Sequence, residues 1–147
     1  MIQWIQSNGF TLLQSVGIIA SLLFSAHALR ADSRERKIET LFTLTAANRD
    51  LWKTLYDRPE LRRILEPSIK GAPEPVPTLE EEVFVRSLIF HLAASFRARK
   101  YGMYFDEAGL SEDIRHLFSK PIPRAIWSII ERYQERDFTQ FITQHLD

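Results

Sequence analysis

The chain has 147 residues, no cysteine, and 19 basic residues that are balanced by 19 acidic ones. This length allows one modest domain with a real core. The absence of cysteine excludes disulfides and thiolate metal sites. The zero net charge provides no general attraction for polyanions, so we expect no duplex nucleic acid as a partner.

Charge is distributed very unevenly along the chain. Residues 1–29 contain no Asp, Glu, Lys or Arg, and every charged side chain lies in residues 30–147. Residues 10–29, FTLLQSVGIIASLLFSAHAL, supply the roughly 20 apolar residues that cross a hydrocarbon core of about 30 Å. We therefore expect an N-terminal segment, residues 1–30, that contains one transmembrane helix.

Two other structures fit this uncharged segment less well. A buried helix of a soluble protein rarely has so long an uncharged stretch that is apolar on all sides. A cleaved signal sequence needs a positively charged start, which is absent here, although Ala26-His27-Ala28 loosely fits a cleavage site. The lipid bilayer is thus the expected partner of this segment.

Basic residues crowd the C-terminal flank of the uncharged segment and are absent from its N-terminal flank. They are Arg30, Arg34, Arg36 and Lys37. The positive-inside tendency then predicts a single-pass protein of the cell inner membrane, with its N-terminus outside and its C-terminal domain in the cytoplasm. The same cluster suits contact with anionic lipid headgroups.

Small and polar residues recur at helical spacing within the segment. Gly17, Ser21 and Ser25 are four residues apart, and Gln14 lies one turn earlier. Small side chains let helices approach closely in lipid, and Gln14 can hydrogen-bond across an interface. We expect these four residues to form an oligomer face and the protein to be a homo-oligomer.

The remainder of the chain has helical rather than alternating periodicity. The predicted fold class is therefore all-α: one transmembrane helix that continues into a stalk, followed by a compact bundle of about five helices. Residues 31–66 hold the stalk helix and a short capped helix, residues 67–78 form a loop with four prolines, and residues 79–147 form a helical domain that packs with residues 38–66.

Local signals set the expected ends of these helices. Three pairs have capping-box spacing: Asp57 with Glu60, Thr78 with Glu81, and Asp137 with Gln140. The helix after Thr78 is apolar on several sides and should lie at the centre of the domain, ending near Gly102. The stalk carries an apolar stripe at spacings of three and four, made of Ile38, Leu41, Phe42, Thr45, Trp52, Leu55 and Tyr56, with Leu44 and Leu51 widening it.

The order of these features resembles a group of uncharacterised bacterial single-pass membrane proteins with a small cytoplasmic helical domain. The resemblance rests on SLLFSAHALR, ANRDLWKTLYDRPELRRIL, YGMYF and a closing segment with Trp and two Phe, and it extends over nearly the whole chain. It implies a bacterial inner-membrane protein and no catalytic residue.

No catalytic motif is present in the sequence. The four histidines are scattered without metal-ligand spacing, and there is no Gly-rich phosphate loop and no nucleophile elbow. We expect a protein that is not an enzyme and that has no cofactor and no metal. His91 lies on the apolar central helix and is expected to be a buried, hydrogen-bonded histidine.

One basic cluster suggests a ligand. Arginine binds phosphates in bidentate fashion and tyrosine stacks on bases, so the cluster is a candidate anion site, made of Arg97, Arg99, Lys100, Tyr101 and Tyr104. Two functions follow. The favoured one is a non-enzymatic membrane-anchored interaction or sensor protein with a cytoplasmic protein partner. The alternative is an oligomeric membrane effector gated by a small anionic nucleotide messenger, as used in antiviral defence.

Overall fold

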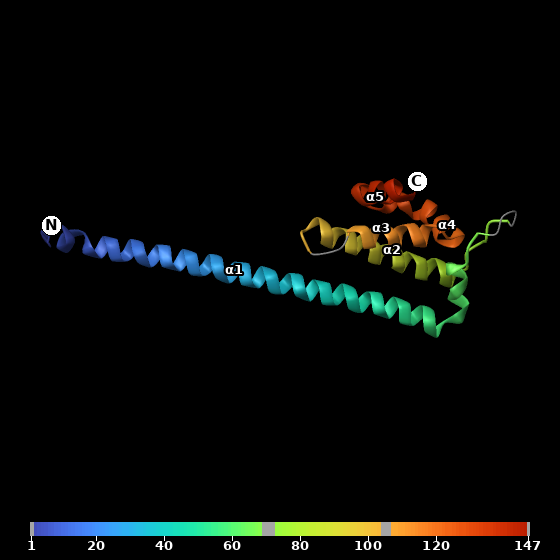
Figure 1. The fold of residues 1–147 in the computed structure, drawn as a ribbon, viewed down its shortest axis with the longest axis horizontal. Helices are drawn as coiled ribbons and strands as arrows, with labels where there is room; N and C mark the ends of the chain where they lie inside the picture. The colour runs from blue at the N-terminus through green and yellow to red at the C-terminus, as the bar shows by residue number, and fades with distance from the viewer. Residues whose placement is uncertain (1, 69–72, 104–106, 147) are drawn as a thin grey trace. The chain divides into compact units, whose positions relative to one another are not determined.

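The computed structural model describes residues 2–68, 73–103 and 107–146, apart from the side chains of residues 2–8, 10 and 12. Every regular element in this part is helical, which confirms the all-α class (Figure 1). The elements are α1 (Ile2–Asp57), the 3-10 helix η1 (Pro59–Leu65), α2 (Leu79–Lys100), α3 (Glu107–Phe118), α4 (Pro121–Ile130), the 3-10 turn η2 (Glu131–Tyr133) and α5 (Arg136–Leu146).

The chain divides into two compact units, Met1–Thr40 and Leu41–Asp147, called here the N-terminal unit and the helical unit. The N-terminal unit is the first part of α1. Two of its hydroxyl groups are satisfied within the helix: Ser15 Oγ donates to the Thr11 carbonyl and Ser21 Oγ to the Gly17 carbonyl, each at 2.8 Å. Such bonds hide polar groups in an apolar setting.

The apolar side chains of the N-terminal unit are exposed all round the helix. Exposures of 53–77% are found for Leu13, Val16, Ile18, Ile19, Leu22, Leu23, Phe24 and Leu29. The structure therefore leaves this segment uncovered, and its burial in a bilayer stays a prediction. Among the described residues, one helix, Leu13–Asp57, is long and apolar enough to cross a membrane by length and composition. A signal sequence meets the same criteria.

In the helical unit, α2 is the central element, as predicted. Val85 and Ile89 are fully buried and Leu92 and Phe96 nearly so, while residues around much of the helix circumference are buried with them. The core also contains Leu55 of α1, and α3 contacts α2, α4 and α5. Each buried aliphatic or aromatic side chain of this kind contributes about 1.5–3 kcal/mol.

Aromatic rings join the last helices to α2. The Phe96 ring centroid lies 5.5 Å from Phe138 and 5.0 Å from Phe141. Trp127 of α4 lies 5.3 Å from Phe118 and meets Phe138 edge-on at 6.1 Å. Tilted and edge-on pairs are the favoured geometries, so these contacts hold α4 and α5 in a defined orientation on the core.

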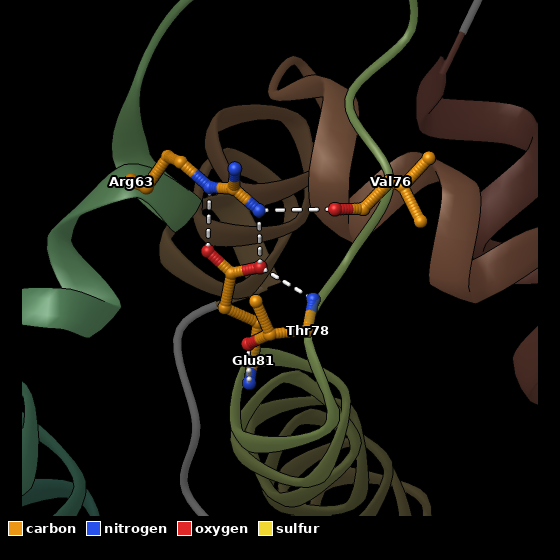
Figure 2. Close-up of polar contacts among 4 residues, drawn as sticks. All are labelled: Arg63, Val76, Thr78 and Glu81. Atoms are coloured by element: carbon orange, nitrogen blue, oxygen red, sulfur yellow. Dashed lines mark hydrogen bonds and ion pairs between the residues drawn. The ribbon is translucent and has the colours of Figure 1, made fainter.

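A buried carboxylate begins α2 (Figure 2). Glu81 Oε2 accepts from the Thr78 backbone N–H at 2.8 Å, and the Thr78 hydroxyl accepts from the Glu81 N–H at 3.3 Å. The predicted Thr78–Glu81 capping box is thus confirmed. Arg63 of η1 binds both carboxylate oxygens, at 2.8 and 2.7 Å, and also donates to the Val76 carbonyl at 3.0 Å.

The other two predicted capping boxes are wrong. Because α1 runs to Asp57, this residue ends a helix instead of starting one. The cap of η1 is Arg58, which makes no side-chain cap bond and pairs with Glu60 at 2.7 Å. Asp137 lies inside the first turn of α5, where its carboxylate binds Lys100 instead of capping.

Two further expectations concern helix α1 and the end of α2. Of the predicted stalk stripe, only part packs on the core: Leu55 is buried and Leu51 half-buried, whereas Phe42 and Tyr56 are 73% and 76% exposed. Gly102 follows the end of α2 with φ of 71°, the left-handed conformation of a helix C-terminus. The predicted helix stop at Gly102 is confirmed.

Candidate binding groove

An apolar groove of about 320 Å³ opens in the helical unit between α1, α2 and α3. This volume falls within the range of about 300–1,000 Å³ that is usual for small-molecule sites. Its lining is largely leucine and aromatic: Leu51, Trp52, Leu55, Leu65, Phe84, Leu88, Leu92, Leu110 and Leu117, with Asn48, His91, Ser95, Gly109, Asp113 and His116 as its other residues.

The groove exists because α1 packs on α2 through few side chains. Leu51 and Leu55 reach the core, while Trp52, one position from Leu51, is 55% exposed and forms a wall. The opposite wall comes from α3, where Leu110 and Leu117 are two helical turns apart and share a face. Asp113 and His116 lie between these leucines and bring polar groups to that wall.

Three ionisable side chains meet at the groove. Desolvation lowers the pKa of the half-buried His91, and the nearby charge of Asp113 opposes that shift. Desolvation raises the pKa of Asp113, while His116 and His91 act in the opposite direction. The two helices thus place a carboxylate and two imidazoles within electrostatic range of one another.

This arrangement favours a cationic or hydrogen-bond-donating group over an anionic one. Asp113 is the only carboxylate among the described residues that line the groove, and none of those residues is Lys or Arg. A lowered pKa keeps His91 uncharged at neutral pH. The exposed Trp52 ring offers a face for a cation. In the described part of the chain, no group of three or more His, Asp or Glu side chains is arranged to hold a metal ion.

The predicted anion cluster lies elsewhere, at the end of α2, and its basic groups are paired. Arg97 binds Glu135 at 2.7 Å, Arg99 binds Glu107, and Lys100 binds Asp137. The Asp137 bond raises the pKa of Lys100. Arg99 also lies 5.1 Å from the Phe141 ring centroid. An anion would have to displace three carboxylates to use these groups.

The other residues predicted to bind a ligand, lipid or a second copy, where the structure describes them, lie on exposed surface and do not line the groove. Tyr101 is 72% exposed at the end of α2, and Tyr104 lies outside the described residues. The basic residues Arg30, Arg34, Arg36 and Lys37 are exposed on α1, with Arg36 bound to Asp32 at 3.0 Å. The predicted oligomer face is also exposed on α1: Gln14, Gly17, Ser21 and Ser25.

Sequence reasoning identified His91 but not its companions on α3. His91 is half-buried, so the expectation of a buried histidine is only partly met. Asp113 and His116 were missed, although Asp113 is three residues after Leu110 and four before Leu117, which places it on the apolar face of α3, and His116 follows it by three residues. The signal available in the sequence was the pair Asp113 and His116, two polar residues next to the leucines of one helix.

Comparisons of the chain with protein-family models, with curated proteins and with solved structures gave no match. The geometry of the groove and the exposed uncharged helix therefore carry the functional argument.

Proposed function

We propose that the chain is a non-enzymatic, membrane-anchored sensor whose helical unit binds a small ligand with an apolar body and a cationic head. The observation that carries the proposal is the groove: an apolar cavity of about 320 Å³ with a single carboxylate at its wall. Leucines would cover the apolar body of the ligand, and Asp113 and Trp52 would bind its head.

The anchor in this proposal is α1. Its uncharged segment is exposed all round, and the basic residues that follow it suit the cytoplasmic side of a bacterial inner membrane. The alternative of an effector gated by an anionic nucleotide stays a prediction. The paired state of Arg97, Arg99 and Lys100 does not favour it.

Three probes that share one apolar body test the charge preference of the groove. Phenethylamine, 2-phenylethanol and phenylacetate carry positive, neutral and negative heads. Added to the full chain in mild detergent, the amine should raise the unfolding temperature most and phenylacetate least, because a ligand that binds only the folded state stabilises it. An equal shift for all three would contradict a cationic head.

Variants then locate the site. Asp113→Asn should remove the preference for the amine, and Leu88→Trp should fill the groove and abolish all three shifts. The control is Glu112→Gln, since Glu112 is the neighbouring carboxylate, pairs with Arg115 and does not line the groove. An amine shift that survives both groove variants would contradict the assignment.

A further inference from the structure

A second exposed feature of α1 is a set of four large apolar side chains, of which only Trp52 also lines the groove. Large apolar side chains there remain open to solvent: Ile38 at 45%, Phe42 at 73%, Trp52 at 55% and Tyr56 at 76%. The core of the helical unit contacts a different side of α1, the side that carries Leu51 and Leu55. A soluble surface rarely leaves this many large apolar groups on one helix without a partner.

The spacing of these residues identifies the kind of partner. The series Ile38, Phe42, Thr45, Arg49, Trp52 and Tyr56 advances by four, three, four, three and four residues. Alternation of three and four, a repeat of seven, is the pattern of a helix that packs lengthwise on another helix in a left-handed coiled coil. The apolar repeat therefore fits a helix and not a globular pocket.

The two polar members of the series are compatible with such packing. Thr45 donates its hydroxyl to the Leu41 carbonyl at 2.9 Å, so its methyl group is available for contact without an unsatisfied polar atom. Arg49 is exposed and lies near Asp50, at 3.9 Å. Its long side chain can lie along the helix pair with its charge in water.

The same spacing continues toward the N-terminus into the uncharged segment. Counting back from Ile38 in alternating steps of three and four passes Glu35, Ala31, Ala28 and Phe24 and then reaches Ser21, Gly17 and Gln14. A Cβ added at Gly17 would meet no atom within 4 Å, so the helix surface there is open to close approach. Ser25 falls outside this series.

A second copy of the chain is the partner that fits both stretches. Copies inserted in one bilayer with the same orientation present the same series at the same depth, so parallel helices meet in register. We propose that α1 self-associates as a parallel coiled coil along Gln14, Gly17, Ser21, Ile38, Phe42, Thr45, Trp52 and Tyr56. The common register of the copies depends on the membrane anchor of the proposed function.

The absence of cysteine makes a cysteine scan direct. Single cysteines would be placed at each position from 38 to 56 of the full chain and oxidised in native membranes. The crosslinked dimer should peak at 38, 42, 45, 49, 52 and 56, with a period of about 3.5 residues. A flat profile, or adducts with a different protein in place of the dimer, would overturn the proposal.

Charge variants give a second readout that does not touch the groove. Phe42→Glu combined with Tyr56→Glu should convert the detergent-purified oligomer to monomer, because four buried carboxylates would meet at a dimer interface. The control is Val83→Glu on α2, since Val83 is 57% exposed and lies off the series. An oligomer unchanged by the double variant would overturn the coiled coil.

The outcomes separate this inference from the proposed function. If the protein stays in membranes but its crosslinking profile is flat, the membrane anchor is supported and the coiled coil is contradicted. If the protein is found in the soluble fraction and still crosslinks with a period of about 3.5 residues, the membrane anchor is contradicted and the pairing of α1 is supported. Ligand shifts at the groove are measured separately from both.

Discussion

At the scale of single residues, Glu81 shows how a charge is kept inside this protein. Its side chain is 3% exposed, and its two oxygens accept from Arg63 and from the Thr78 backbone. A buried carboxylate is tolerable only when its lone pairs are satisfied in this way. The result is a link between η1, the chain before α2 and the first turn of α2 (Figure 2).

Removal of this carboxylate should weaken the fold. We expect Glu81→Ala to lower the free energy of unfolding by about 2 kcal/mol, since charge-assisted hydrogen bonds and half of the capping box are lost. Chemical denaturation of the full chain in mild detergent, followed by circular dichroism, measures the change. Glu80→Ala, in the same helical turn but exposed, is the control and should change little.

Glu81 should also make stability depend on pH. The Arg63 hydrogen bonds lower the pKa of Glu81 below its ordinary value of 4.5. A carboxylate with a lowered pKa in the folded state contributes stability above pH 4.5, and that contribution is lost as the pH falls toward the folded pKa. Glu81→Gln should therefore flatten the acid limb of the stability profile. An acid limb identical to that of the wild type would contradict this assignment.

At the scale of elements, the last turn of α2 is a junction between helices. Basic residues in a last turn complement the helix dipole, and here they also bind acidic residues of α3, α5 and the segment before α5. Each exposed pair contributes little energy by itself. Together they occupy the cationic groups that would otherwise attract an anionic ligand.

The end of α2 also depends on one backbone conformation. Gly102 has φ of 71°, which costs an L-residue about 1 kcal/mol. We expect Gly102→Ala to lower the free energy of unfolding by about that amount, and Gly102→Asn to lower it less because Asn tolerates the left-handed region. Equal stability of the alanine variant and the wild type would show that the turn does not hold this conformation in solution.

The ion pairs predict a negative result for nucleotides. Because Arg97, Arg99 and Lys100 each bind a carboxylate, cyclic and linear nucleotides should not raise the unfolding temperature of the full chain at low salt. A clear shift that disappears in Lys100→Ala would instead support the effector gated by an anionic messenger.

At the scale of the whole molecule, an exposed uncharged helix precedes a separate helical core. Among the residues that the structure describes, the core cluster of the helical unit begins at Leu51. Apolar side chains exposed at 53–77% over several turns are unfavourable in water and are typical of a surface that contacts lipid or protein. A bilayer removes that exposure, which is the physical reason for the proposed anchor.

Fractionation tests this anchor directly. The full chain should stay with membranes during an alkaline wash, and a variant that lacks residues 1–30 should be released. Protease added outside spheroplasts should leave the C-terminal part intact if it is cytoplasmic. Release of the full chain by the wash would contradict the anchor, and loss of the mature N-terminus would identify a cleaved signal instead.

The sequence by itself determined the features that depend on near neighbours. The uncharged run, the helical periodicity, the Thr78–Glu81 cap and the Gly102 stop are read from residues a few positions apart, and the structure is all-α and has the same two signals. The Asp57 cap failed because α1 runs through that residue, and the Asp137 cap failed because α5 begins at Arg136 and the Asp137 carboxylate binds Lys100 of another helix.

Only the tertiary structure decided which side chains meet across the chain. Lys100 and Asp137 are 37 positions apart, and His91 reaches Asp113 only because α3 folds back beside α2. Leu55, Phe42 and Tyr56 belong to the same predicted apolar stripe of α1, but the packing of the helical unit buries Leu55 and leaves Phe42 and Tyr56 exposed. Local periodicity specifies which face of a helix is apolar, but which part of that face is covered depends on the helix that packs against it.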